Sequence, residues 1–128
     1  MRWTDRQLEA ITRNERRILV SAAAGSGKTA VLVERILRKI TNPSYPQDIT
    51  RFLMVTFTKA AAAEMRGRLA KALSQRLAKA DPDSEEGRLL LRQLMLLPAA
   101  QITTVHAFCM RLIRENFHAL ALPASFRL

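Results

Sequence analysis

The sequence ILVSAAAGSGKTAVLVERI, residues 18–36, constrains the fold of this chain more than any other segment. An apolar run at residues 17–21 predicts a buried strand, and the apolar positions over residues 27–40 recur at helical spacing. Between them, GSGKT has the spacing of a phosphate-binding loop, in which glycines let the backbone turn tightly around an anion. A strand that enters a helix through such a loop predicts an α/β fold with a parallel sheet.

The predicted phosphate-binding loop supplies each part that phosphate binding requires. Backbone N–H groups and the positive end of the helix dipole attract phosphate. In such a loop the lysine reaches the β- and γ-phosphates and the next hydroxyl binds Mg²⁺, so we expect these roles for Lys28 and Thr29. The usual pattern begins with glycine where this chain has Ala22, so the prediction requires a negative φ there. The alternative is an ordinary Gly-Ser-Gly turn with an exposed lysine. The predicted nucleotide-binding residues of the loop are Ala22, Ala23, Ala24, Gly25, Ser26, Gly27, Lys28 and Thr29.

The rest of the chain continues the alternation of strands and helices. Apolar runs predict strands at residues 17–21, 52–57 and 101–105. Helical patterns and their end signals predict helices at residues 4–14, 27–40, 58–80, 88–97 and 107–118. This order predicts a parallel sheet flanked by helices, with an additional helix inserted before the third strand.

Charge and composition narrow the class of partner. The net charge is +10, from 21 lysines and arginines against 11 acidic residues, which favours a polyanion such as nucleic acid or nucleotide. The single cysteine, Cys109, excludes an internal disulfide and is expected to be a small buried apolar residue. No apolar run reaches the roughly 18 residues of a membrane span. The chain begins without the apolar core of a signal peptide, so we expect a cytoplasmic protein without membrane contact.

Four segments together resemble the first motifs of superfamily 1 DNA helicases of the UvrD/RecB type. They are WTDRQLEAI (3–11), AAAGSGKTAVLVERI (22–36), VTFTKAAAAEMRGRL (55–69) and ITTVHAFCMRLIREN (102–116). Within that family the chain is most similar to the AddA helicase–nuclease subunits. One departure is Lys59, where the family often has asparagine, and this lysine adds a possible phosphate contact in place of the asparagine's hydrogen bonds.

The resemblance implies a role for residues in each segment. Gln7 matches the glutamine that reads adenine, because its amide can donate to and accept from the base edge. The alternative is that Gln7 only closes a capping box with Thr4. The residues implied to contact single-stranded DNA are Thr56, Phe57, Thr58, Lys59, Thr104 and His106. For Phe57 the alternative is a core position, and for His106 it is helix capping.

The family also implies a function and its cofactors. The expected fold is a P-loop NTPase (RecA-like) sheet, incomplete in this chain, with ATP and Mg²⁺ as cofactors. Residues 1–128 would form the N-terminal part of the ATP-binding domain of a helicase/nuclease, holding motifs Q, I, Ia and the next DNA-contact motif, with later motifs absent. Its partners would be single-stranded DNA, double-stranded DNA ends and an AddB-like subunit. Its role would be recombinational repair.

No acidic residue ends an apolar strand, so we predict no catalytic residue within the chain and no hydrolysis by it alone. Three alternatives remain. The first is a UvrD-type helicase without nuclease, and the second is a non-catalytic nucleic-acid-binding module. The third is a small nucleotide kinase, in which the ITTVHAFC segment would have no role.

Overall fold

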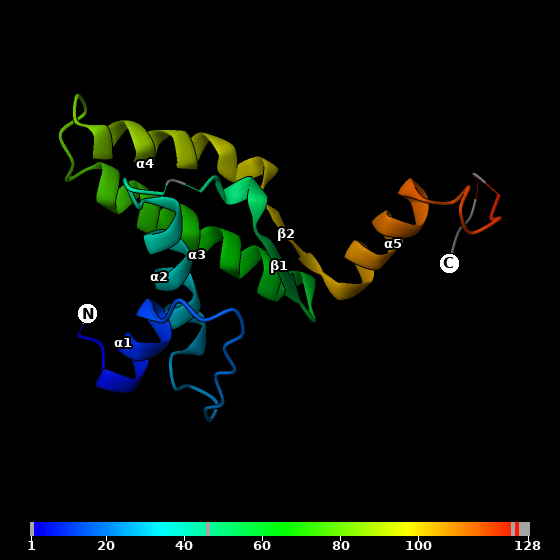
Figure 1. Ribbon diagram of the computed structural model, residues 1–128, viewed down its shortest axis with the longest axis horizontal. Helices are drawn as coiled ribbons and strands as arrows, with labels where there is room; N and C mark the ends of the chain where they lie inside the picture. Colours follow the sequence, from blue (N-terminus) through cyan, green and yellow to red (C-terminus); the bar gives the residue numbers. More distant parts are fainter. Residues whose placement is uncertain (1, 46, 124, 126–128) are drawn as a thin grey trace.

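Helices surround a short parallel sheet in the computed structural model, which describes residues 2–45, 47–123 and 125 (Figure 1). The elements are α1 (Asp5–Thr12), α2 (Lys28–Ile40), the 3-10 turn η1 (Ile49–Arg51), β1 (Leu53–Thr56), α3 (Lys59–Leu77), α4 (Glu85–Leu96), the 3-10 turn η2 (Leu97–Ala99), β2 (Gln101–Thr104) and α5 (Val105–Glu115). Across these described stretches, every helix is too short or too polar to cross a membrane. The observed architecture confirms the predicted α/β class with a parallel sheet.

The sheet consists of β1 and β2, paired in parallel from Leu53 opposite Gln101 to Thr56 opposite Thr104. The connection between them contains α3 and α4, which confirms the helix predicted before the last strand. Only one face of β1 is covered, because Met54 is buried while its neighbours Leu53 and Val55 are exposed. The run at residues 52–57 is therefore a strand, as predicted, but it is not buried on both faces.

The strand predicted at residues 17–21 is wrong. Within the described part of the chain, only β1 and β2 pair as strands, and residues 17–21 lie in the irregular connection between α1 and α2. The side chain of Leu19 is 95% exposed. An apolar run becomes a strand only where a neighbour satisfies its backbone groups and another layer covers its side chains, and neither is present here.

The core centres on α3, which packs against α2, α4 and both strands of the sheet. The predicted apolar face of α2 is confirmed, since Val33, Ile36, Leu37 and Ile40 are all buried. A bidentate contact also joins α2 to α3, because Nη2 of Arg76 lies 2.9 and 2.8 Å from the two carboxylate oxygens of Glu34. Other buried apolar residues include Met65, Leu69 and Leu73 of α3 and Leu90 of α4.

A polar network fixes the other side of the core. The side chain of Gln93 is fully buried, and its Oε1 accepts a hydrogen bond of 2.9 Å from the N–H of Ile49. Its Nε2 donates to Asp48, whose carboxylate also accepts two bonds from Arg92. This network holds α4 against η1, the turn that precedes β1.

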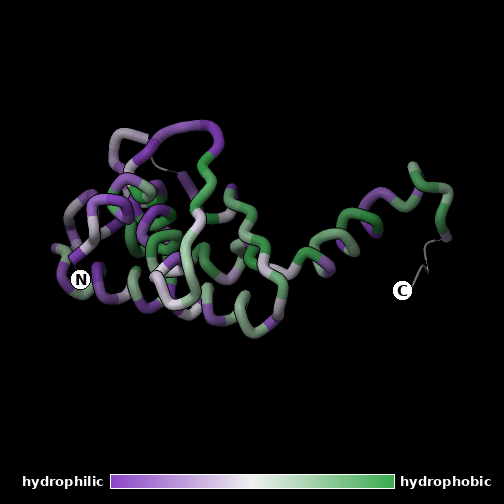
Figure 2. The backbone as a smooth tube through the Cα atoms, turned by 90° about the horizontal axis from the view of Figure 1, so that it is seen from below, coloured by the Kyte–Doolittle hydropathy of each residue, from purple (hydrophilic) through white to green (hydrophobic). Residues whose placement is uncertain are grey.

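Helix α5 extends away from the other elements (Figures 1 and 2). None of its described residues is buried, and its main contacts are with the two strands at its base. Cys109 is exposed, so its predicted burial is wrong, and the apolar residues Phe108 and Ile113 of this helix are only partly covered. The side-chain pattern is amphipathic, but no described element packs along it.

Threonine and serine caps set where the helices begin. The hydroxyl of Ser84 accepts from the N–H of Gly87, so α4 begins at Glu85 and not at residue 88. The hydroxyl of Thr104 accepts from the N–H of Ala107, so α5 begins at Val105 and not at residue 107. In both cases the cap satisfies an N–H group that has no partner within the helix.

Candidate functional site

The predicted phosphate-binding loop turns through two glycines in the left-handed region. Gly25 has φ of 78° and Gly27 has φ of 82°. Of the described non-glycine residues, only Ala121 has a positive φ. The φ of Ala22 is therefore negative, as the predicted loop requires. Alanine therefore fits at the position where the usual pattern has glycine, and the two remaining glycines make the turns that require them.

Lys28 begins α2 and folds its side chain back into the loop. Its Nζ donates to the carbonyl oxygens of Ala22 at 2.6 Å and Ala23 at 2.8 Å. The loop is closed further by a hydrogen bond of 3.3 Å from the N–H of Ser26 to the oxygen of Ala23. The ammonium group therefore sits among backbone carbonyls at the N-terminus of a helix, where an anion is attracted by both the lysine charge and the helix dipole.

The backbone donors at the start of α2 are available to a ligand. The first bond within this helix runs from the N–H of Val31 to the carbonyl of Gly27. The N–H groups of Lys28, Thr29 and Ala30 thus precede the first intrahelical acceptor. Thr29 is exposed on this first turn, one residue after the lysine. The hydroxyl oxygen of Ser26 is buried without a hydrogen-bond partner among the described residues.

Gln7 lies against the loop from the neighbouring helix α1. Its Oε1 accepts from the N–H of Thr4 and its own N–H donates to the Thr4 hydroxyl, which confirms the capping box. Its Nε2 donates to the carbonyl of Ser26 at 3.2 Å. Each atom of the amide keeps one further bonding position, because Nε2 carries a second hydrogen and Oε1 a second lone pair. Reading a base edge is therefore compatible with the capping role and stays a prediction.

A pocket of about 460 Å³ opens between α1 and the loop. Its lining includes Gln7, Ala22, Ser26 and Lys28, so the structure brings these predicted nucleotide residues to one cavity. The sequence analysis did not identify Arg35 as a residue that holds α1 against α2. Its Nη1 donates to the carbonyls of Ala10 and Ile11 at the end of α1. The available signal was its position two helical turns after Lys28, on the same side of α2.

The residues predicted to contact DNA gather at the carboxyl edge of the sheet. Thr56 pairs with Thr104 at the ends of the two strands, and Thr58 and Thr104 cap the helices that follow. The ring of Phe57 is 96% exposed, so the core alternative for this residue is wrong. His106 is exposed on the first turn of α5, where Thr104 and not the histidine provides the cap.

A pocket of about 270 Å³ lies at this edge between α3 and β2. Lys59 and Arg66 line one side of it, and Thr103 and Thr104 line the other. The guanidinium of Arg66 donates to three carbonyl oxygens, those of Leu97, Pro98 and Ile102, at 3.1 to 3.4 Å. Carbonyl partners leave the positive charge of Arg66 unneutralised, and among the described residues neither Arg66 nor Lys59 forms an ion pair, so both positive charges remain at this edge. No hydrogen bond within the described part of the chain joins this edge to the phosphate loop.

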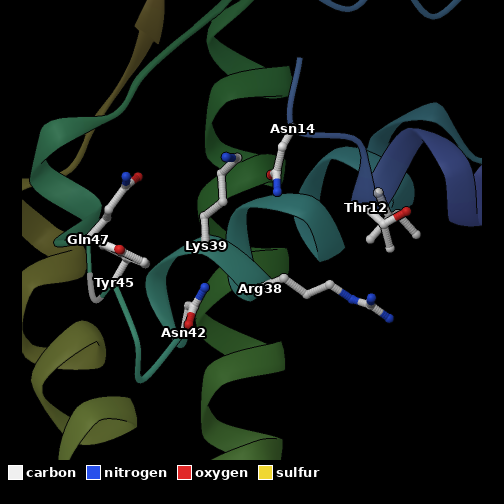
Figure 3. Close-up of a pocket in the computed structure, with 8 residues that line it drawn as sticks. Thr12, Asn14, Arg38, Lys39, Asn42, Tyr45 and Gln47 are labelled. Carbon is white, nitrogen blue, oxygen red and sulfur yellow. The ribbon is translucent and has the colours of Figure 1, made fainter. Parts of the chain in front are cut away.

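A third pocket, of about 360 Å³, lies at the other end of α2 (Figure 3). Its labelled lining includes Asn14, Arg38, Lys39, Asn42 and Tyr45. The side chain of Arg38 extends away from that of Lys39 in Figure 3, and its Nε lies 3.2 Å from the Glu34 carboxylate. The two cations do not converge on one position, so this pocket lacks the arrangement of an anion site.

This chain is similar, over nearly its whole length, to one known protein family and to individual proteins. The family description "UvrD/REP helicase N-terminal domain" matches residues 3–128. An ATP-dependent helicase/nuclease subunit of Acetivibrio thermocellus is 56% identical over 127 residues. The proteins of the same name from Clostridium beijerinckii and Geobacillus kaustophilus are each 55% identical over 127 residues. Each match covers 99% of this chain and 10% of the relative, so the chain spans about a tenth of their length. By the family match, the chain belongs to the UvrD/REP helicase family, whose N-terminal domain it matches.

Proposed function

We propose that this chain binds ATP with Mg²⁺ as the ATP-binding part of a DNA helicase. The observation that carries the proposal is the loop geometry, in which two left-handed glycines and the Lys28 ammonium surround the N-terminus of α2. The relatives are named as ATP-dependent helicase/nuclease proteins, which supports the same function. Hydrolysis of the bound ATP in the complete helicase would supply the free energy that drives movement along DNA.

Different residues of the site would bind different parts of the nucleotide. Lys28 would exchange its two carbonyl partners for phosphate oxygens, which are stronger acceptors for an ammonium group. The N–H groups of the first turn of α2 would donate to the same phosphates. The exposed Thr29 hydroxyl would bind Mg²⁺, and the unpartnered Ser26 hydroxyl supports the presence of a polar ligand, since a buried hydroxyl without a partner is costly. The free positions on the Gln7 amide would pair with adenine.

The electropositive sheet edge would carry single-stranded DNA. The exposed ring of Phe57 offers a stacking surface, worth about 1–3 kcal/mol per base. Lys59 and Arg66 would attract phosphates without reading sequence, and Thr58 and Thr104 place two helix N-termini at the same edge. His106 projects from the first turn of α5 and would add a further contact. The net charge of +10 supports a nucleic-acid partner.

The proposal for the wider function rests on the resemblance to AddA-type helicases, and the names of the relatives support part of it. We propose that the protein unwinds and processes double-stranded DNA ends for recombinational repair, with a nuclease activity and an AddB-like partner, in the cytoplasm. The words "helicase/nuclease" in those names support the nuclease, and the word "subunit" supports the partner.

Titration of a fluorescent ATP analogue with Mg²⁺ tests the proposed function. We expect saturable binding by the unaltered chain and at least tenfold weaker binding by Lys28→Ala, a loss of about 1.4 kcal/mol. Lys39→Ala is the matched control, because Lys39 lies at the far end of α2 and should leave the affinity unchanged. Equal affinities for all three folded chains, or no binding by any of them, would contradict the proposal.

A further inference from the structure

We propose that Gln7 is a positioning residue of the phosphate loop, which aims a backbone donor at the phosphates whatever base the nucleotide carries. This role rests on the proposed nucleotide site and is additional to any contact with adenine. It follows from one hydrogen bond that joins residues 19 positions apart in the sequence, from Nε2 of Gln7 to the carbonyl of Ser26.

The bond fixes the orientation of a whole peptide unit. The carbonyl of Ser26 and the N–H of Gly27 belong to one planar group, and no described peptide bond is cis. In a trans peptide the C=O and N–H bonds point in opposite directions. Holding the Ser26 carbonyl toward Gln7 therefore turns the Gly27 N–H away from Gln7, so that it remains a donor for an anion in the loop.

Without an anchor this peptide would reorient easily. Gly27 has no side chain to restrict its backbone, and it already occupies the left-handed region at φ of 82°. A Cβ on Gly27 would lie 3.3 Å from Nε2 of Gln7, so the absent side chain also lets the glutamine approach this closely. The loop thus combines a peptide that can flip with one external bond that opposes the flip.

Gln7 itself is held firmly enough to act as the anchor. Its Oε1 accepts a bond of 3.0 Å from the backbone N–H of Thr4, which orients the amide group. Arg35 ties the other end of α1 to α2 through the carbonyls of Ala10 and Ile11. Both ends of α1 are therefore fastened, one to the phosphate loop and the other to the helix that begins there.

The proposal predicts an effect that does not depend on the base. If Gln7 only read adenine, Gln7→Ala would weaken binding of ATP and leave inorganic tripolyphosphate unaffected. If Gln7 positions the loop, the substitution weakens both ligands. For one lost hydrogen bond we expect a decrease in affinity of about 3- to 10-fold for tripolyphosphate, and at least as much for ATP.

Isothermal titration of the chain with Mg²⁺ and either ligand separates these outcomes. Thr4→Ala is the matched control, because it removes the helix-capping hydroxyl while the Thr4 backbone N–H still orients the Gln7 amide. Weaker tripolyphosphate binding by Gln7→Ala, with affinity retained in Thr4→Ala, is the expected result. Unchanged tripolyphosphate binding by Gln7→Ala overturns the positioning role and leaves the nucleotide site intact.

Hydrogen exchange tests the positioning role without any ligand. Gln7→Glu keeps an oxygen that accepts from Thr4 but replaces the Nε2 donor, so the capping box survives and the bond to Ser26 is lost. We expect faster exchange of the amides of residues 23–27 in Gln7→Glu and Gln7→Ala, and not in Thr4→Ala. Equal loop exchange in all four chains overturns the proposal, whether or not the chain binds nucleotide. A different outcome is that Gln7→Glu and Gln7→Ala exchange faster but the unaltered chain binds neither ATP nor tripolyphosphate. That outcome would contradict the proposed function and would still support the role of Gln7 in holding the loop.

Discussion

Replacement of Gln93 by leucine removes the buried side chain that joins α4 to the 3-10 turn η1. The Gln93 oxygen accepts the N–H of Ile49 at 2.9 Å, and both residues are fully buried. Leaving this N–H without an acceptor costs about 1–3 kcal/mol. The lost bond to Asp48 adds little, because that carboxylate keeps two bonds from Arg92 and is partly open to water. We therefore expect Gln93→Leu to lower the free energy of unfolding by about 1–3 kcal/mol.

Urea unfolding followed by circular dichroism measures this loss. A change of about 1–3 kcal/mol corresponds to a drop in midpoint on the order of 1 M. Gln75→Leu is the matched control, since Gln75 is exposed on α3 and its replacement should change the unfolding free energy by less than about 0.5 kcal/mol. A Gln93→Leu chain as stable as the unaltered one would refute the reasoning, because its buried Ile49 N–H would then have no energetic cost.

Three other sites give further predictions. The hydrogen bond from Arg92 is the main cause that lowers the pKa of the Asp48 carboxyl below its ordinary value of 3.8. The charged Asp48 carboxylate therefore stabilises the fold when the pH is above the ordinary pKa of 3.8. This stabilisation is lost as the pH falls through the lower pKa that Asp48 has in the folded chain. Urea midpoints should fall less steeply with acid in Asp48→Asn, and identical pH profiles would contradict this. Arg35→Met should speed amide exchange in α1 while the middle of α2 stays protected, because two bonds at the end of α1 are lost. Phe57→Ala should weaken binding of oligothymidylate by about 1–3 kcal/mol in fluorescence anisotropy. The urea midpoint of Phe57→Ala should equal that of the unaltered chain, since Phe57 is 96% exposed. A much lower midpoint would show that Phe57 packs in the core.

Local patterns predicted the parts of the fold that depend on local physics. The apolar spacing in α2 identified its buried face, and Thr4 with Gln7 identified a capping box that the structure confirms. The loop condition at Ala22 could also be stated in advance, because the allowed φ of alanine is a property of the residue alone.

Features that depend on distant neighbours could not be read from the sequence. The apolar runs at residues 17–21 and 52–57 look alike, but only the second has a parallel partner strand and a covered face. Burial of Phe57 and Cys109 likewise depends on whether another element packs over them, and none of those described does.

The contacts that shape the candidate sites are also long-range. Gln7 reaches Ser26 across 19 positions, and Arg66 reaches the carbonyl of Ile102 across 36. Both side chains have strong local explanations, a capping box for the glutamine and a solvated basic face for the arginine. Sequence spacing alone could not choose between those explanations and the contacts made in the fold.

We propose that ATP with Mg²⁺ occupies the pocket between α1 and the glycine loop. Amide chemical-shift mapping of the isotope-labelled chain tests it directly, residue by residue, as the nucleotide is added. The largest shifts should fall at residues 22–30 and at the side-chain amide of Gln7. Shifts centred instead on the pocket of Lys39, Asn42 and Tyr45, or none in a folded chain, would contradict it.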